Sequence, residues 1–467
     1  VASSRKSLPS PPIEAPRSLM MTLPRRLLGG VSVLLAIAAT GCRDGSSPDP
    51  TPPDLRRRID SLQIVVERLR EARFVEPVQG RYIPRSRLLE VYDSVATEAL
   101  DPADSAWSEL QWAFGFVDTL AVDDLSADSL DRASIDAFYA RGILWVVDDM
   151  RGSGEELDLT VAHELVHALQ DQRWDLKRTM DEAGGIDRRL ALQYLVEGEA
   201  RLVETMLRER RTDSLLEALP QLPLDAYRDT LRAGDGLDPE FVTIPVLHPY
   251  EQGAHVLARR LTAGGWDAID RWWRHPPRSS ACFLFQGEAC FLPSLLPLAP
   301  LQIHPPGWRR IHRGAIGAVY TSILLSLWSG SSDWIPPGTL RSEAFLAGGA
   351  DLAPDSVISG MRADSFALYA DDSGSLSLAW RTSWRDDASA SRFLESWSRL
   401  LVRKQRGDRI RRHVPGTLTL AEDRPSGVWD RVERFGREVW ILEGFPGRSP
   451  PSFEGGARRP HGLATRP

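Results

Sequence analysis

Apolar residues recur at helical spacing through most of the first 275 residues. The first clear case spans residues 54–74, where apolar side chains repeat at intervals of four and three positions: Leu55, Ile59, Leu62, Val66 and Leu69. This pattern predicts an amphipathic helix. Because the stripe covers fewer than three heptads, we expect the helix to dock on the rest of the chain. Self-association as a coiled coil is the alternative that its spacing leaves open.

Strand patterns are confined to a few segments. Residues 143–147 form one short β-branched and aromatic run, which predicts a strand made of Ile143, Leu144, Trp145, Val146 and Val147. Near the C-terminus, hairpins are predicted over residues 366–384 and 428–442, with a helix between them. We therefore expect an α+β fold. A mostly helical domain with a short edge sheet covers residues 75–275, and a smaller α+β module covers residues 311–447.

Two further segments fit neither unit. Residues 276–310 are apolar and irregular, and from Ser279 to Trp308 the only charged residue is Glu288. The stretch is too short and too interrupted by proline for a transmembrane helix, which leaves an insertion or a frame error as interpretations. It contains Cys282 and Cys290, which could pair in an oxidising compartment. Residues 448–467, rich in Pro, Gly and Arg, are predicted to be a disordered tail.

The composition of the N-terminal residues indicates a targeting segment rather than part of the fold. Residues 1–41 are predicted to comprise upstream sequence and a secretory signal peptide, because an arginine pair precedes an apolar run too short to span a bilayer permanently. The run ends in Ala-Thr-Gly-Cys, which resembles the lipobox of bacterial lipoproteins. That resemblance implies cleavage before Cys42 and lipidation of this cysteine. The Pro-rich residues 42–53 would then be a tether. An ordinary signal peptide followed by a cysteine without a role is the alternative.

The charge of the chain excludes one class of partner. The whole chain carries −7 and residues 1–41 carry +4, so the remainder carries −11. An acidic surface without clustered Lys and Arg argues against nucleic acid as a partner. With three cysteines in 467 residues, the chain is not a disulfide scaffold either.

Residues 157–176, LDLTVAHELVHALQDQRWDL, contain the candidate chemistry. His163 and His167 are four positions apart, so on a helix they lie on the same flank and can share one metal ion. Glu164 is rotated by about 100° from His163 and can act as general base on a water at that metal. Zinc suits this chemistry because it lowers the pKa of bound water and polarises a carbonyl. The alternative is a chance arrangement, but unpaired imidazoles on so apolar a helix would be costly.

A catalytic zinc also needs a third protein ligand and one open position. Residues 191–206, ALQYLVEGEARLVETM, resemble the third-ligand helix of the glutamate zincins, where E-G-x-A follows an apolar run. The resemblance implies that Glu197 is the third ligand, with Glu199 as the alternative. If no metal binds, both glutamates would lie on a solvated helix face, with Glu197 paired to Arg201 four positions on.

Residues 248–255, HPYEQGAH, resemble the Y-E-K-G-A stretch of the M1 aminopeptidase family of glutamate zincins, with Gln252 in place of the lysine. The resemblance implies that Tyr250 donates a hydrogen bond to the oxyanion of the tetrahedral intermediate. Tyr250 as a packing residue, and His248 or His255 as other ligands, are the alternatives. The G-x-M-E-N motif with which that family holds a free amine is absent, which favours an endopeptidase.

The stretches FYARGILWVVDD, AHELVHALQDQRWDL, LVEGEARLVE and PYEQGAHVLARRLTAGGWDAI also resemble, in this order, an uncharacterised group of bacterial zincin-like peptidases. Zincins place a substrate-binding sheet edge before the metal helix. The resemblance therefore implies that Ile143–Val147 pairs with an extended peptide, and an ordinary internal strand is the alternative. Asp171 either orients a ligand histidine by a hydrogen bond or lies at a solvated end of the helix.

These features together predict a zinc metallopeptidase, exported and membrane-anchored as a lipoprotein of the bacterial cell envelope. Its substrate is a peptide or protein, and it meets the membrane through a lipid on Cys42. One Zn²⁺ per chain would be held by His163, His167 and Glu197, with Glu164 as general base and Tyr250 as oxyanion donor. The alternative is a non-catalytic envelope binding or assembly lipoprotein that retains a zincin fold.

Overall fold

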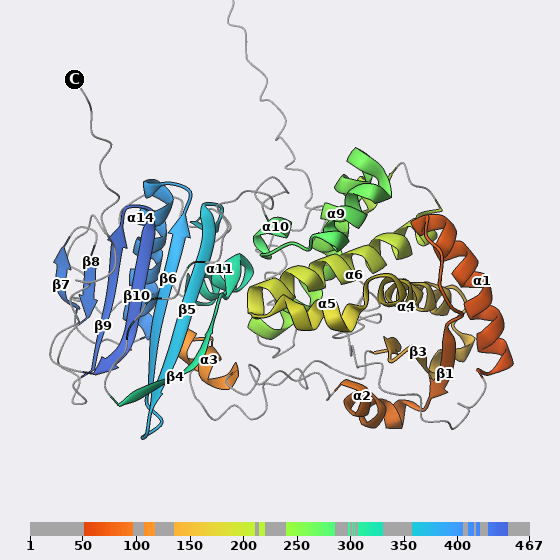
Figure 1. Ribbon diagram of the computed structural model, residues 1–467, viewed down its shortest axis with the longest axis horizontal. Coiled ribbons are helices and arrows are strands. Elements are labelled where there is room, and N and C mark those ends of the chain that lie inside the picture. Colours follow the sequence, from red (N-terminus) through yellow and green to blue (C-terminus); the bar gives the residue numbers. More distant parts are fainter. Residues whose placement is uncertain are drawn as a thin grey trace, which may run out of the picture.

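The computed structural model describes residues 51–96, 107–116, 135–210, 214–219, 240–284, 298, 301, 303, 307–329, 357–404, 410–414, 417–420 and 428–446. The predicted signal peptide, Cys42 and the predicted tail lie outside these residues. Within the described ranges, no helix is both long and apolar enough to span a bilayer. The fold is α+β, as predicted, with a helical unit and a unit built on a large sheet (Figure 1).

The helical unit is built around three long helices that share one apolar core, α4 (Glu155–Trp174), α6 (Ile186–Glu209) and α9 (Glu240–Arg274). Shorter helices surround them: α2 (Leu88–Ala96), α5 (Leu176–Ala183), α7 (Leu215–Ala218) and α10 (Ala281–Leu284). α9 is interrupted at Gly264 and Gly265, whose backbone angles are not helical. This pair divides α9 into two segments, and both segments contribute to the core.

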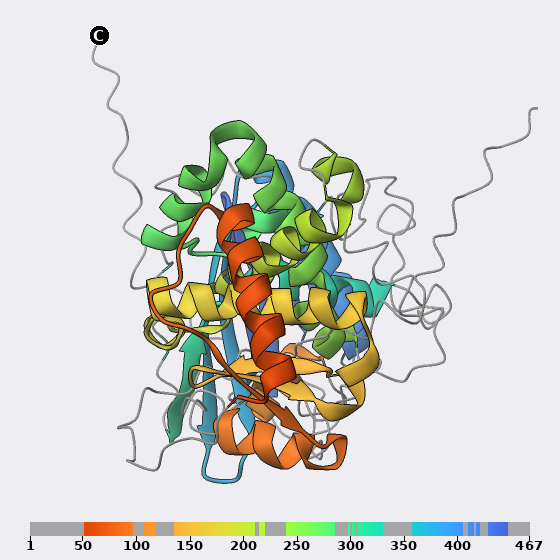
Figure 2. The same cartoon turned by 90° about the vertical axis from the view of Figure 1, so that its right-hand side faces the viewer.

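The predicted N-terminal helix is α1 (Pro53–Arg70), and it docks on the body. Its apolar stripe is buried against α4, which α1 crosses in Figure 2. Arg70, in its last turn, is buried too, and it donates hydrogen bonds to Glu199 of α6 and Asp270 of α9. The ring of Trp266 lies 4.2 Å from the Arg70 guanidinium carbon. This docking confirms the prediction for the helix, and Arg70 links it to two of the three long helices.

A small sheet lies beside α4 and consists of β1 (Gln79–Ile83), β2 (Ala137–Ala140) and β3 (Ile143–Val147). The strand order is β1-β3-β2, with β3 parallel to β1 and antiparallel to β2. The strand predicted at Ile143–Val147 is therefore present, but its prediction as a substrate-binding edge is wrong. Its backbone groups already pair with a strand on each side, so no peptide can add to it.

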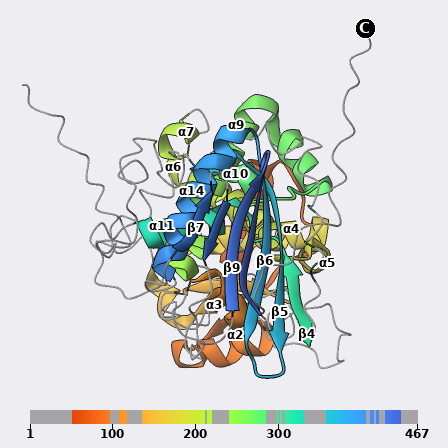
Figure 3. The same cartoon turned by 90° about the vertical axis from the view of Figure 1, so that its left-hand side faces the viewer.

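The second unit is a seven-stranded antiparallel sheet in the order β4-β5-β6-β10-β9-β8-β7. Its strands are β4 (Trp308–Gly314), β5 (Met361–Asp371), β6 (Leu376–Trp384), β7 (Ile410–Val414), β8 (Thr417–Leu420), β9 (Val428–Phe435) and β10 (Glu438–Pro446). Both predicted hairpins are confirmed, as β5–β6 and β9–β10. The predicted helix is α14 (Asp387–Lys404), which packs on one face of the sheet (Figure 3) through Phe393 and Trp397 against Trp380.

Each unit is completed by a helix that the sequence places with the other unit. α3 (Trp107–Phe114) precedes α4 in sequence but packs on the large sheet, where Phe114 contacts Phe366 and Trp380 at ring-centroid distances of 5.4 and 5.1 Å. In the other direction, α11 (Gly317–Ser329) contributes Val319 and Ile323 to the helical core. The predicted boundaries at residues 275 and 311 therefore do not separate two independent cores.

The described start of the predicted 276–310 insertion is part of the helical core. Cys282 and Phe283 of α10 are fully buried, and Phe283 packs between Tyr194 of α6 and Trp272 of α9. Cys282 is disulfide-bonded, whereas Cys290 lies outside the described residues. Unrelated sequence from a frame error would not be expected to fill a core position so closely.

Candidate metal centre

Helix α4, which carries both candidate histidines, has sequence features that define its start and its end. Glu155, Glu156 and Asp158 lie in its first turn, where carboxylates favour the positive end of the helix dipole. The helix ends at Asp175, which adopts a left-handed conformation (φ 51°). Between these ends a continuous run of residues from Val161 to Gln170 is buried, so the histidines of α4 are held inside the protein.

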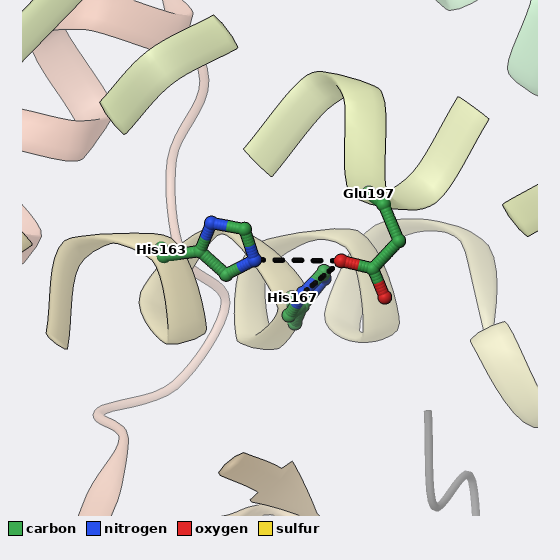
Figure 4. A group of neighbouring side chains, drawn as sticks. All are labelled: His163, His167 and Glu197. Atoms are coloured by element: carbon green, nitrogen blue, oxygen red, sulfur yellow. Dashed lines mark ion pairs between the residues drawn. The ribbon is translucent and has the colours of Figure 1, made fainter. Parts of the chain in front are cut away.

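The structure brings together the three predicted ligands. Nε2 of His163 and Nε2 of His167 each lie 3.4 Å from the same oxygen, Oε2 of Glu197, as Figure 4 shows. The two histidines come from α4 and the glutamate from α6, and all three side chains are buried. Within the described part of the chain this is the one group of three such side chains whose ligand atoms lie close enough to hold a metal ion.

The chemistry of this group fits zinc. None of the three converging atoms has a hydrogen-bond partner, and buried polar atoms without partners are costly. Ligand atoms about 2.0–2.2 Å from a tetrahedral zinc ion are separated from each other by about 3.3–3.6 Å. The two measured separations of 3.4 Å fall in that range. The ligand atoms are therefore spaced for a shared ion rather than for hydrogen bonds with each other.

The far nitrogen of each imidazole is held by a partner that the sequence analysis missed. Nδ1 of His163 lies 3.3 Å from Oε2 of Glu204, and Nδ1 of His167 lies 3.0 Å from Oε1 of Gln170. Gln170 in turn donates to the carbonyl oxygen of Val196, at 3.1 Å. Donation from each Nδ1 leaves each Nε2 as the lone-pair atom that a metal requires. The available signal was helical spacing, since Glu204 lies two turns beyond Glu197 on the same face.

Glu204 is itself held by cations. Arg201 donates to it at 2.6 Å and Arg208 also donates to it. Arg201 additionally pairs with Glu251 of α9, at 2.9 Å. Although burial opposes ionisation, these arginines and the nearby His163 hold the pKa of Glu204 at about 2. Glu204 therefore presents a fixed negative charge behind His163.

The electrostatics of the site favour added positive charge. Burial alone would lower the pKa of His163, but contacts with Glu197 and Glu204 raise it to about 10. Burial alone would raise the pKa of Glu197, but His167 and His163 hold it at about 2. Both shifts mean that the carboxylates favour positive charge beside them, which a divalent cation at the two Nε2 atoms would supply.

Glu164 and Tyr250 lie at the same place. Glu164 is buried on α4, and its charge acts on both histidines and on Tyr250. The ring of Tyr250, from α9, stacks on that of His163 with centroids 5.7 Å apart and planes 15° apart. Burial and the negative charges of Glu197 and Glu164 raise the pKa of Tyr250 well above 10. Tyr250 therefore keeps its proton and remains a hydrogen-bond donor at neutral pH.

Two glycines allow α6 and α9 to approach this closely. A Cβ on Gly198 would lie 2.5 Å from the carbonyl carbon of Gly253, and a Cβ on Gly253 would lie 2.4 Å from the backbone oxygen of Tyr194. Gly198 directly follows Glu197, and Gly253 lies three residues after Tyr250. The backbone contact between these glycines therefore places the third ligand and the tyrosine at one point.

The alternative candidates are occupied elsewhere, in contacts that stabilise the fold. The contacts are Glu199 with Arg70 and Trp273, His248 with Tyr194 Oη at 2.5 Å, His255 with the backbone oxygen of Leu219 at 2.6 Å, and Asp171 with Tyr139 Oη at 3.0 Å and the backbone nitrogen of Leu176 at 3.1 Å. Asp171 thus does not hold a ligand histidine. Glu197 is buried and not paired with Arg201, so the solvated-face interpretation is wrong.

Comparisons with known proteins address the other unit. A family model described as a domain of unknown function (DUF8575) matches residues 309–450. This range coincides with the seven-stranded sheet together with α11 and α14, and it excludes all three candidate ligands. No curated protein and no solved structure matches the chain. The match to this family therefore covers the sheet unit, and the family is described as one of unknown function.

Proposed function

We propose that this protein is a zinc-dependent peptidase of the zincin type, exported and held at a bacterial cell envelope by a lipid on Cys42. The observation that supports the proposal best is the convergence of three buried ligand atoms without hydrogen-bond partners, in which each imidazole nitrogen lies 3.4 Å from the glutamate oxygen. Glu164 and Tyr250 beside this group are the two further side chains that peptide hydrolysis requires.

In the proposed mechanism, the roles of Glu164 and Tyr250 follow from their protonation states. Zinc, when bound, supplies a Lewis acid that polarises a carbonyl and lowers the pKa of water. Glu164 accepts a proton from the attacking water and returns it to the leaving amine. Tyr250, protonated at neutral pH, donates a hydrogen bond to the carbonyl oxygen as negative charge develops on it. Glu204 and Gln170 keep the two imidazoles oriented throughout.

The test combines metal content with turnover. Zinc is quantified in the purified full chain, and cleavage of casein is followed with and without a chelator. We expect about one zinc per chain and cleavage that the chelator abolishes. Glu164→Gln should keep its zinc but lose at least about 10²-fold in rate, because the general base is gone. Glu155→Gln, an exposed change on the same helix, is the matched control and should leave the rate unchanged.

Three outcomes would contradict the proposal. A chain that binds no zinc would refute the metal site, and a Glu164→Gln variant as active as the wild type would refute the mechanism. Zinc binding without cleavage of casein or other unfolded proteins would instead support the non-catalytic envelope lipoprotein.

A further inference from the structure

A cavity lies away from the candidate metal centre, at the junction of the two units. Its volume is about 590 Å³, and its walls come from the start of α6, from β4 and β5, and from the start of α11. Four arginine side chains line it: Arg188, Arg278, Arg313 and Arg362. They are contributed by four separate segments of the chain, so the fold gathers them at one place.

In the described part of the chain, no carboxylate lies within ion-pair distance of these four arginines. Among the described residues, none of them takes part in an ion pair or a side-chain hydrogen bond, and Nε of Arg188 is buried without a partner. Elsewhere in the helical unit, Arg70 and Arg201 each pair with two carboxylates. Guanidinium groups gathered around one cavity repel one another, and an anion that they share would relieve that repulsion.

The N-terminus of α6 adds to this positive potential. Gly184 and Gly185 line the cavity and lead into the helix with positive φ angles of 54° and 84°. No side chain caps the first turn of this 24-residue helix. The backbone N–H of Asp187 in this turn donates to the carbonyl oxygen of Ala315, at 3.3 Å, so it is the helix dipole that favours an anion at this end.

Two carboxylates also line the cavity, and both are committed to internal contacts. Asp187 accepts hydrogen bonds from the backbone nitrogen and hydroxyl of Ser280. Asp364 accepts hydrogen bonds from the backbone nitrogens of Ile316 and Gly317 and from the indole of Trp380. With four guanidinium groups against two carboxylates, the described residues of the lining carry a net charge of at least +2.

We infer that this cavity is a binding site for a small anion that carries carboxylate or phosphate groups. Its volume lies within the range of about 300–1,000 Å³ that is usual for small-molecule sites. Asp187 precedes Glu197 by ten residues on α6, which places the cavity about 15 Å along the helix from the metal ligands. The site is therefore distinct from the metal centre, and a bound anion would contact both units.

The test is calorimetric titration of the purified full chain with inorganic phosphate and, separately, with succinate. We expect one anion per chain, with binding that weakens as salt concentration rises. The double substitution Arg278→Ala and Arg313→Ala should weaken binding about tenfold or more. Arg309→Ala, an exposed arginine on β4 that does not line the cavity, is the matched control and should change nothing.

The result separates this site from the proposed catalytic function. Glu197→Gln disables the proposed zinc site but should bind the anion as the wild type does. Binding of phosphate alone or of succinate alone would identify the preferred anion. The inference is overturned if neither anion binds at about 10 mM. It is equally overturned if the double variant, with an unchanged circular dichroism spectrum, binds as tightly as the wild type. Both substituted arginines are exposed, so the double variant is expected to fold.

Discussion

Glu204 provides the sharpest test of how the metal centre is built. Its carboxylate lies 3.3 Å from Nδ1 of His163, its side chain is 14% exposed, and its pKa of about 2 keeps it charged at working pH. A carboxylate in this position both orients the imidazole and increases its basicity, and losing such a partner typically costs 10- to 100-fold in metal affinity. That range corresponds to about 1.4–2.7 kcal/mol.

Two substitutions separate orientation from charge. Glu204→Gln keeps an oxygen that accepts from Nδ1 and removes only the charge, so we expect a loss near the lower limit, about tenfold. Glu204→Ala removes both contributions and should approach a 100-fold loss. Zinc affinity is measured by competition with a chromogenic chelator at fixed pH.

The matched control is Glu251→Gln. Glu251 pairs with Arg201, as Glu204 does, but has no contact with His163. Zinc affinity should therefore change little in this variant. The reasoning is refuted if Glu204→Ala binds zinc as tightly as the wild type. It is also refuted if Glu251→Gln weakens zinc binding as much as Glu204→Gln.

Three further predictions follow from the buried polar groups. Tyr250→Phe should lower kcat for casein by about 10²–10³-fold with zinc content unchanged, whereas loss of zinc would assign the tyrosine a structural role. Arg70→Ala leaves Glu199 buried without the cation that it pairs with and removes one of two cations from Asp270, which keeps Arg173. It should therefore lower the free energy of unfolding by about 3–5 kcal/mol in urea titrations. The control Arg73→Ala, whose side chain is 88% exposed, should change it little, and equal effects would contradict the reasoning. Burial and the nearby Asp187 raise the pKa of Asp364 from 3.8 to about 7, so between these values the folded state binds more protons than the unfolded state. Stability should therefore fall as pH rises from about 4 to 7, by up to about 4 kcal/mol from this group, and Asp364→Asn should flatten that slope. An unchanged slope in the variant would assign the pH dependence to other groups.

The two histidines of the candidate metal centre could be placed together from sequence because their relative positions follow from local geometry. His163 and His167 are four positions apart, which is about one turn of helix, and that relation holds in any tertiary context. The placement of Glu197 depended on a resemblance, and the structure bears out its position opposite the histidines.

The contacts that depend on tertiary packing were not predictable. Glu204 meets His163 across 41 positions of sequence, and Arg70 meets Glu199 across 129. Nothing in either local sequence indicates the partner. The strand at Ile143–Val147 is a further example. Its composition predicts a strand but cannot show that one edge of this strand pairs with β1, some sixty residues earlier in the sequence. The packing of α3 on the large sheet could likewise not be predicted, because it depends on residues of both the helix and the sheet.

The contact between Gly198 and Gly253 has a consequence for interpreting other sequences. Because neither position has room for a Cβ, a side chain at either one would push α6 and α9 apart and move Tyr250 away from Glu197. A substitution at one glycine cannot be compensated at the other, since the obstructing atoms belong to backbone. A related chain that retains both histidines and the glutamate but carries a larger residue at either glycine would therefore have lost the geometry of this centre. This pair of glycines is a diagnostic of the intact site that ligand motifs alone do not provide.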